Sequence, residues 1–342
     1  MKKLFMIIVS MIFFATAVLS FTACGHKSHE VSIKYYADGS QIVSAILGEE
    51  ENIGLVPEPA ASNLINRTAT QGKTLYSLDL QELYDENSGS FPQAVLMVKE
   101  SVLSNYPQTA SAFESGIDEN VAWAKTNTAD AVNAVKSKLE TSTLNINALS
   151  GKAIDGCKIY YESAQDSESV VKTYTEEIIA LNSSSAKSVE DDFFYNTTAP
   201  VNSEKTNLSV YVPDGAPALA IAKFIADQND LGTNLTVNYY VVATSLVSSQ
   251  LVPAYRGGTA DIIILPLNLA TKFYNTDQNT EDNYKMVSVI THGNFYIIST
   301  EQITIENLKG KRIAVPQQNA IPDWTFRIVL KKHGLTGVNI ED

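Results

Sequence analysis

The sequence predicts an α/β fold in which buried strands alternate with helices, and three observations lead to this prediction. Short continuous apolar runs, such as residues 262–265, are typical of strands that are covered on both faces. Each run ends at a corner that carries Pro, Gly, Asp, Asn or Gln. A helical pattern begins soon after the corner, as in residues 268–274. This alternation predicts mostly parallel sheets with right-handed crossovers.

Composition limits the size of the protein and its classes of partner. The 342 residues, 44% of them hydrophobic, leave room for two domains or lobes. The net charge of −13 argues against nucleic acid as a partner, because phosphate binding needs a basic face. The two cysteines, Cys24 and Cys157, are too few for a disulfide framework or a thiolate metal site. We expect neither a metal site nor a cofactor.

The first residues match the pattern of a bacterial lipoprotein signal peptide over 1–23. A basic start precedes an apolar run over 4–21, and small residues stand before Cys24. Cleavage would leave Cys24 to take a diacylglycerol, with residues 24–30 as a lipidated tether. Phe21 departs from the pattern, which usually has Leu, and an uncleaved transmembrane anchor is the alternative. Either way, we expect the body at the extracytoplasmic face of the membrane.

The first half of the body predicts strands and helices in alternation, followed by a helical stretch. In order, we expect a strand ending at 36, a helix over 40–47, a strand over 53–56, a helix over 60–66, a peripheral segment over 75–83, a polar loop over 85–90 and a buried strand over 91–98. The helical pattern continues as separate pieces over 110–116, 120–125 and 131–139. Residues 154–163 look irregular or strand-like, and 167–181 predict a strong helix with one apolar stripe.

A polar segment without periodicity, 197–205, predicts a linker, and a second βα series follows it. The expected strands are 208–212, 236–242, 260–265, 286–290, 294–299 and 313–315. The expected helices are 216–228, 246–255, 268–274 and 323–333.

Motifs spread along the body carry a resemblance to a known family. They are Tyr-Ala-Asp-Gly-Ser (36–40), Val-Pro-Glu-Pro-Ala (56–60), Phe-Pro-Gln-Ala (91–94), Val-Pro-Asp-Gly-Ala-Pro-Ala-Leu-Ala (212–220), Gly-Gly-Thr-Ala-Asp-Ile-Ile-Ile-Leu-Pro-Leu-Asn-Leu-Ala (257–270), Thr-His-Gly-Asn-Phe-Tyr (291–296) and Leu-Lys-Gly-Lys-Arg-Ile-Ala-Val-Pro-Gln (308–317). With these motifs the chain resembles a solute-binding lipoprotein of an ABC importer, of the nitrate/sulfonate/taurine and thiamine-precursor type. Each motif is weak alone, and together they cover nearly all of the chain after the leader.

The order of the motifs differs from that of the family. Residues 31–195 resemble the family's second part, and residues 206–342 resemble its first part. We interpret this order as a circular permutation with 197–205 as the join, because permutation is tolerated where cut and join lie in exposed loops. A fusion of two truncated gene copies, or an assembly artefact, is the alternative.

The resemblance implies the two-lobe periplasmic-binding-protein type II fold, with two crossing segments as the hinge. Lobe one would comprise 102–196 and 206–290, lobe two would comprise 31–90 and 299–342, and the crossings would be 91–101 and 291–298. Both chain ends would then lie in lobe two. The implied mechanism is closure of the lobes on a ligand, after which a membrane permease recognises the closed form.

The strand-to-helix corners predict one ligand cleft, because open α/β sheets bind ligands beyond the carboxyl ends of their strands. Asp214, Gly215 and Ala216 begin a helix that offers N–H groups to a ligand, or Asp214 or Gly215 only caps that helix. The other candidates are Asn268, His292, Asn294, Gln317, Gln318, Asp38, Ser40 and Glu58. His292, paired with Asp38, is what an enzyme would have to use, but a lone His is more often structural, and no Ser or Cys partner is evident.

The charges at the corners indicate the kind of ligand. Asp38, Glu58 and Asp214 are carboxylates, and the corners contain no Lys or Arg. A small polar molecule that is neutral or bears an amine, such as a pyrimidine-like compound, is therefore favoured over a sulfonate, which would depend on helix starts for positive potential. The sequence has no nucleophile-elbow, zincin or P-loop motif, so we expect no enzyme. A surface ligand sensor on the same fold is the alternative function, and an enzyme that uses the cleft is a weaker one.

Overall fold

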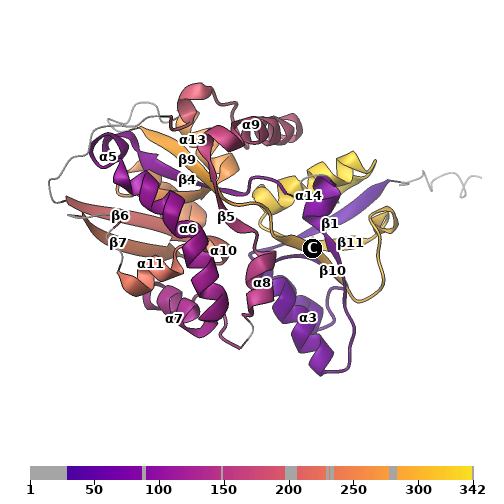
Figure 1. Ribbon diagram of the computed structural model, residues 1–342. Coiled ribbons are helices and arrows are strands. Elements are labelled where there is room, and N and C mark those ends of the chain that lie inside the picture. The colour runs from indigo at the N-terminus through magenta and orange to yellow at the C-terminus, as the bar shows by residue number, and fades with distance from the viewer. Residues whose placement is uncertain are drawn as a thin grey trace, which may run out of the picture.

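The computed structural model confirms an α/β fold with two six-stranded sheets flanked by helices (Figure 1). It describes residues 29–86, 90–147, 149–196, 206–228, 231, 235–276 and 283–340. The predicted signal peptide, Cys24 and the predicted linker 197–205 lie outside the described residues. No helix in these ranges is long and apolar enough to cross a bilayer.

Sheet A combines strands from both ends of the chain, in the order β12-β1-β11-β2-β10-β3. Its strands are β1 (Glu30–Tyr36), β2 (Ile53–Pro57), β3 (Tyr76–Asp79), β10 (Phe295–Ser299), β11 (Arg312–Pro316) and β12 (Thr336–Asn339). The edge strand β12 lies parallel to the start of β1, and Ile340 N donates to Ile33 O at 3.0 Å. The C-terminal strand β12 therefore pairs side by side with the N-terminal strand β1, and the two are not joined end to end as one strand.

Sheet B has the order β5-β9-β4-β8-β6-β7 and comes from the middle of the chain. Its strands are β4 (Ala94–Lys99), β5 (Ile159–Ser163), β6 (Thr206–Pro213), β7 (Leu235–Val242), β8 (Ile262–Pro266) and β9 (Tyr284–Thr291). The apolar runs of β4 and β8 are almost wholly buried, as their continuous hydrophobic sequences predicted.

Both sheets are more mixed than the βα alternation predicted. Among the neighbouring strand pairs that the structure describes, five are parallel and five are antiparallel. Strands β4 and β10 run against the neighbours on both of their sides. Each of them begins directly after a segment that passes from one sheet to the other, which reverses the direction of the chain relative to the βα units.

The helices follow the predicted pattern with local differences. They are α2 (Gly39–Leu47), α3 (Ala60–Thr70), α4 (Leu80–Tyr84), α5 (Glu100–Asn105), α6 (Gln108–Thr126), α7 (Thr128–Lys138), α8 (Gly151–Gly156), α9 (Ala164–Leu181), α10 (Ala216–Ala220), α11 (Ala222–Asp227), α12 (Val252–Arg256), α13 (Leu267–Thr276) and α14 (Ile321–Lys332). The predicted pieces over 110–116 and 120–125 form one helix, α6. Gly116 inside it lacks a side chain, so the ring of Phe224 fits where a Cβ would lie 2.2 Å from its Cζ.

Two other segments also differ from the sequence-based prediction. The irregular stretch 154–163 resolves into the end of α8 and strand β5. The single helix predicted over 246–255 is a 3-10 turn (Thr244–Leu246), a π-helical turn (Val247–Leu251) and then α12. Pro253 lies in the first turn of α12, where its missing N–H costs no helical hydrogen bond, so the regular helix begins only there.

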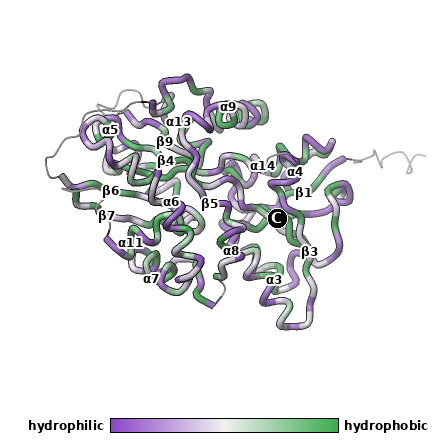
Figure 2. The backbone as a smooth tube through the Cα atoms, viewed as in Figure 1, coloured by the Kyte–Doolittle hydropathy of each residue, from purple (hydrophilic) through white to green (hydrophobic). Residues whose placement is uncertain are grey.

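Two extended segments cross between the sheets and are hydrogen-bonded to each other. Phe91 N donates to His292 O at 3.4 Å, and Gln93 N donates to Thr291 O at 2.9 Å. Aromatic rings pack over this crossing: Phe91 stacks on Tyr174 of α9 with centroids 5.6 Å apart and on Phe295 of β10 at 6.0 Å. One hydrophobic core thus continues from sheet A into sheet B. Figure 2 shows hydrophobic stretches within the sheets and hydrophilic stretches on outer turns.

Candidate functional site

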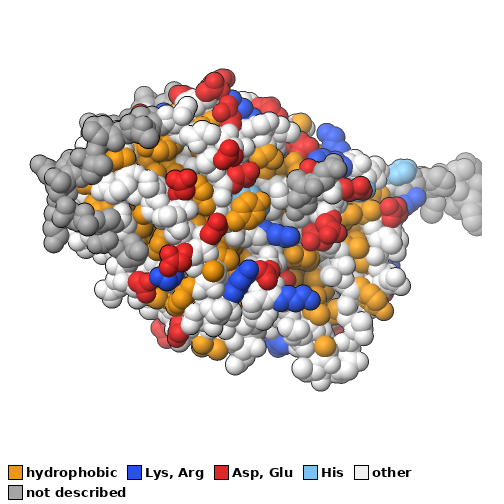
Figure 3. Space-filling view, viewed as in Figure 1, with side chains coloured by type: hydrophobic (Ala, Val, Ile, Leu, Met, Phe, Trp, Pro, Cys, Tyr) orange, Lys and Arg blue, Asp and Glu red, His pale blue; other side chains and the backbone are white. Residues whose placement is uncertain are grey.

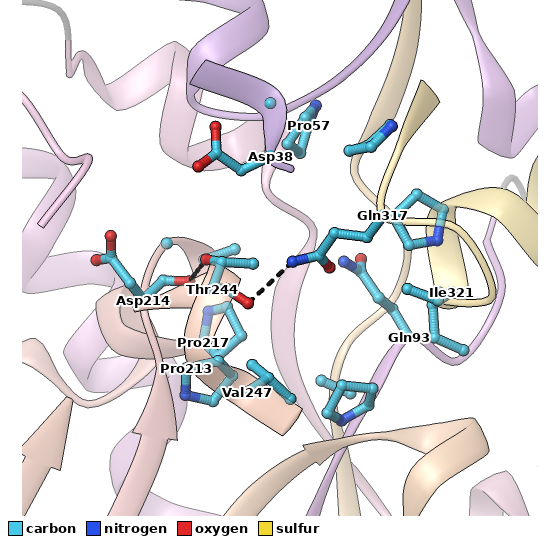
Figure 4. A pocket seen from close by; sticks show the side chains of 18 of the residues that line it. Asp38, Pro57, Gln93, Pro213, Asp214, Pro217, Thr244, Val247, Gln317 and Ile321 are labelled. Atoms are coloured by element: carbon cyan, nitrogen blue, oxygen red, sulfur yellow. Dashed lines mark hydrogen bonds between the residues drawn. The ribbon is translucent and has the colours of Figure 1, made fainter. Parts of the chain in front are cut away.

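A cavity of about 540 Å³ lies between the two sheets and is lined by loop tips from both (Figure 4). All five corners that the sequence predicted to share a cleft contribute to its wall. They are 37–40 and 57–60 after β1 and β2, 213–217 and 266–269 after β6 and β8, and 316–322 after β11. This position follows from the topology, because the carboxyl ends of parallel strands meet at one edge of each sheet.

Of the eleven candidate residues, ten line this cavity and one does not. The ten are Asp38, Ser40, Glu58, Asp214, Gly215, Ala216, Asn268, Asn294, Gln317 and Gln318. Their contact with a ligand stays a prediction. The exception is His292, whose ring stacks on Tyr160 with centroids 3.5 Å apart while Nε2 lies 3.0 Å from Glu162 Oε2.

The conformation of Gly293 explains why His292 is not in the cavity wall. In a regular strand His292 and Asn294 would point to the same side, because side chains alternate with a period of two residues. Gly293 between them has a φ of +83°, a left-handed conformation that breaks this alternation. Asn294 therefore lines the cavity, while His292 is directed to β5 and takes a structural position.

The Asp214 carboxylate is bound within the protein. Oδ1 accepts a hydrogen bond from Ser142 Oγ at 2.6 Å, and Oδ2 accepts from Thr143 N at 2.7 Å and from Thr143 Oγ1 at 2.8 Å. No side-chain bond caps α10, so Asp214 is not its side-chain cap, and its contact with a ligand stays a prediction. Asp214 instead fastens the 142–143 loop to the cavity wall, and this loop brings Thr143 into the lining.

The other two carboxylates bind the starts of helices. Asp38 Oδ1 accepts from Gln41 N at 3.0 Å in the first turn of α2. Glu58 Oε2 accepts from Ser62 N at 3.1 Å, and its Oε1 accepts from Ser62 Oγ at 2.7 Å, at the start of α3. Glu58 is buried, and this burial raises the pKa of its carboxyl above the ordinary value of 4.5. The positive ends of α2 and α3 are therefore compensated by the protein's own carboxylates.

Three amide side chains of the lining have buried oxygens without a hydrogen-bond partner: Gln93 Oε1, Asn268 Oδ1 and Asn294 Oδ1. The amide nitrogens of the two Asn side chains donate to carbonyl oxygens, Asn268 to Ser185 O at 3.4 Å and Asn294 to Glu58 O at 3.2 Å. These bonds orient each amide, so its oxygen is the atom without a partner.

Backbone pairing places these three side chains on adjacent segments. Gln93 N donates to Thr291 O at 2.9 Å, and Leu267 N donates to Gln93 O at 3.0 Å. Gln93 thus lies between the segment that leads to Asn294 and the start of α13 that carries Asn268. The sequence analysis did not propose Gln93 as a site residue. Its signals are the motif over 91–94 and its position after Pro92, directly before a buried strand.

One hydrogen bond spans the cavity from sheet A to sheet B. Gln317 Nε2, after β11, donates to Thr244 O, after β7, at 2.9 Å (Figure 4). Thr244, Ser245 and Ser248 also line the cavity and were not predicted from the sequence. Hydroxyl-bearing residues in a turn have no distinctive local pattern, and their position depends on the 3-10 and π-helical turns after β7.

The charge of the site is acidic. Its described lining contains Asp38, Glu58 and Asp214 and neither Lys nor Arg. Figure 3 shows acidic and basic side chains interspersed over one face of the molecule, without a continuous basic patch there. Within the described ranges, no three His, Cys, Asp or Glu side chains are grouped so that they could hold a metal ion.

Comparison with known proteins gives distant structural similarities only. No protein-family model matches the chain, and no curated protein matches it. It is similar to NikA from Staphylococcus aureus in complex with Ni(L-His)2, with 10% identity, a TM-score of 0.36 and coverage of 80% of this chain and 59% of that one. It is also similar to the oligopeptide-binding protein AppA from Bacillus subtilis in complex with a nonapeptide, with 11% identity, a TM-score of 0.32 and coverage of 78% and 55%.

A third similar structure is NikA from Brucella suis in complex with Fe(III)-EDTA, with 10% identity, a TM-score of 0.30 and coverage of 78% of this chain and 57% of that one. The chain spans less than two thirds of the length of each of these proteins. Similarity at this level assigns neither a family nor a ligand.

Proposed function

We propose that the protein is an extracytoplasmic solute-binding protein that delivers a small polar ligand to an ABC importer by hinged closure of two lobes. The observation that carries this proposal is the cavity between two sheets that are joined by paired crossing segments. Loop tips from both sheets line it, and its volume of about 540 Å³ is in the range of small-molecule sites. A ligand in this position would touch both sheets and would favour their approach.

The crossing segments are suited to act as the hinge. They are held together by the bonds of Phe91 N and Gln93 N, so a rotation of sheet A against sheet B would pivot about this pair. Tyr174 stacks over the same crossing and bonds to Thr325 of α14, which places the contact between α9 and α14 near the pivot. The bond from Gln317 to Thr244 lies across the cavity and would break on opening.

Native mass spectrometry of the full chain, purified from cells without denaturant, tests this function. We expect a bound small molecule that is released when the protein unfolds. After renewed incubation with folded protein, the released molecule should have the same mass as before. An unchanged mass shows that the protein does not convert the molecule that it binds. A folded protein that never carries a small molecule, and whose melting temperature no solute raises, would contradict the proposal.

We also propose that Cys24 carries the lipid that holds the protein at the extracytoplasmic face. The support is the basic, apolar and small-residue pattern of 1–23. Substitution Cys24→Ser should release the protein from membranes or leave the leader uncleaved, and the mass of the mature wild-type N-terminus should include acyl chains. An unmodified wild-type N-terminus that still begins at Met1 would favour the uncleaved anchor.

We propose further that the motif order reflects a circular permutation. Support comes from β12 and β1, which are parallel neighbours at one edge of sheet A, so both ends of the described chain belong to the same edge of one sheet. The test is a rearranged chain in which 206–342 precedes 31–196. It should fold with the same circular dichroism spectrum and carry the same ligand, and failure to fold would contradict the proposal.

A further inference from the structure

The turn between β11 and α14 has an unusual backbone conformation for a segment of the cavity wall. Gln317 and Asn319 have φ angles of +53° and +63°, in the left-handed region that favours glycine. Among the non-glycine residues that the structure describes with a positive φ, these two alone line the cavity. Such conformations cost free energy and persist only where the surrounding structure holds them in place.

Hydrogen bonds fix this turn to β1 on one side and to α14 on the other. Gln317 N donates to Tyr36 O at 2.8 Å, at the end of β1. Asn319 N donates to Asp323 Oδ2 at 2.9 Å, and Asn319 O accepts from Trp324 Nε1 at 2.9 Å. Since both backbone groups of Asn319 are bound by side chains of α14, its left-handed conformation is imposed by that helix.

The Asp323 carboxylate is held in turn by strands β1 and β12. It is 1% exposed, and its Oδ1 accepts from Tyr35 Oη at 2.9 Å and from Arg327 Nε at 2.7 Å. Arg327 Nη1 donates to Gly337 O of β12 at 2.9 Å, and its Nη2 donates to Tyr35 Oη of β1 at 2.7 Å. A buried ion pair with several charge-assisted hydrogen bonds has a well-defined position. Because Asp323 Oδ2 binds Asn319 N, this ion pair also sets the position of the turn.

The side chain of Gln317 extends from the turn across the cavity. Its Nε2 donates to Thr244 O on the wall that belongs to sheet B, and Figure 4 shows this bond between the two walls. A displaced turn would lose the bond, because hydrogen bonds weaken steeply as their geometry departs from the optimum. We propose that Asp323 is a positioning residue of the binding site, which acts through Gln317 to hold the two walls together. This inference rests on the proposed function and deepens it, because approach of the walls is the movement that would enclose a solute.

Asp323→Asn cuts the bond to the turn and leaves the volume of the side chain almost unchanged. Its one amide oxygen would face the two donors, Tyr35 Oη and Arg327 Nε. Its NH2 group would then face the N–H of Asn319 and could not accept from it. We therefore expect the turn to shift and the bond from Gln317 to Thr244 to weaken.

Single-molecule FRET on the full chain measures the separation of the walls, with dyes on unnatural amino acids at the exposed positions 66 in α3 and 133 in α7. We expect Asp323→Asn to shift the lobes at least twofold toward an open form. Combined with Gln317→Ala it should give no further shift, because both changes act on one bond. A wild-type distance distribution in Asp323→Asn, or an additive shift in the double variant, would overturn the inference.

The matched control is Glu51→Gln, which changes another buried carboxylate between a Tyr and an Arg. Glu51 is 2% exposed and accepts from Tyr36 Oη at 2.9 Å and from Arg312 Nε at 3.0 Å. Neither Glu51 nor Arg312 belongs to the described lining of the cavity. We expect Glu51→Gln to lower the melting temperature and to leave the lobe distances of wild type unchanged. Equal shifts in the two variants would refute a specific role of Asp323, because a general loss of stability would then explain both.

A second pair of variants tests the turn without touching the buried ion pair, and it decides the question if Asp323→Asn does not fold. Asn319 is exposed, so its side chain can be changed without disturbing the core. Asn319→Gly keeps the left-handed conformation accessible, whereas the β-branched side chain in Asn319→Val disfavours it. We expect Asn319→Val to open the lobes at least twofold and Asn319→Gly to resemble wild type. Identical distance distributions in these two variants would contradict the inference.

Native mass spectrometry keeps this inference separate from the proposed function. Among chains purified from cells, we expect the fraction that carries the small molecule bound to wild type to be at least twofold lower in Asp323→Asn than in Glu51→Gln. An equal fraction would overturn the inference and leave the proposed function intact. If wild type never carries a molecule, the proposed function fails, and the FRET distributions still decide the role of Asp323.

Discussion

Substitution of Asn268 by Leu measures what the unpaired oxygen costs the ligand-free protein. Leu has the same number of side-chain heavy atoms as Asn, branched at the same carbon, although its methyl groups are larger. It removes the buried Oδ1, whose lack of a partner costs about 1–3 kcal/mol. The substitution also loses the Nδ2 bond to Ser185 O, which at 3.4 Å is long and contributes about 0.5 kcal/mol or less. We therefore expect ligand-free Asn268→Leu to be as stable as wild type or more stable by about 1 kcal/mol.

The matched control is Asn120→Leu, where the same chemical change breaks satisfied bonds. Phe224 N would lose its acceptor in a buried position, and the 2.6 Å bond to Gly116 O would also be lost. Together these losses destabilise the protein by about 2–4 kcal/mol. The changes in the free energy of unfolding caused by the two substitutions should thus differ in sign, or by several kcal/mol, although both replace a buried Asn.

Urea unfolding of the ligand-free chains measures both free energies of unfolding, followed by tryptophan fluorescence and by circular dichroism. Two probes are needed because a chain of two lobes unfolds in one step only if both transitions coincide. A loss of 2 kcal/mol or more in Asn268→Leu would refute the reasoning. It would mean that the oxygen has a partner in the folded ligand-free protein.

Three further substitutions test other parts of the structure. Burial raises the folded-state pKa of Glu58, so the ionisation of this carboxyl destabilises the folded protein as the pH rises from 4.5 through the raised pKa. The free energy of unfolding of wild type relative to Glu58→Gln should therefore fall over that range and be constant below it. Urea unfolding from pH 3.5 to 8 measures this difference. Gln317→Ala removes the bond to Thr244 O, worth about 0.5–1.5 kcal/mol, and should shift the lobes roughly twofold to tenfold toward an open form in single-molecule FRET; an unchanged distance distribution would show that this bond does not hold the lobes. Gly116→Ala would place a Cβ 2.2 Å from the buried ring of Phe224 and should lower the free energy of unfolding by about 1–3 kcal/mol, whereas wild-type stability would mean that the ring moves freely.

The sequence predicted the type and order of most elements, because hydrophobic period and turn residues are local properties. The runs that became β8 and β11, and the helices after them, could be recognised from a few consecutive residues each. The corners could be recognised for the same reason, and ten of the eleven candidate residues lie in one cavity wall. The acidic character of the lining also followed from the residues at these corners alone.

The tertiary structure decided what each side chain does there, because its partners are distant in the sequence. Asp214 is bound by Ser142 and Thr143, about seventy residues away, which no local pattern encodes. The left-handed Gly293 turns His292 out of the wall, although the spacing of His292 and Asn294 placed them together. Conformation at a single residue can reverse the direction of a neighbour, and sequence periodicity cannot express this.

The amide oxygens show the same division between local and distant information. The sequence identified Asn268 and Asn294 as polar residues at corners but could not tell which of their atoms are satisfied. It missed Gln93, because only the pairing with Thr291 and Leu267 brings that residue between them. Local sequence therefore determined which residues reach the cavity. Long-range backbone pairing determined which of their atoms have hydrogen-bond partners, because these partners come from the assembled sheets and not from neighbours in the chain.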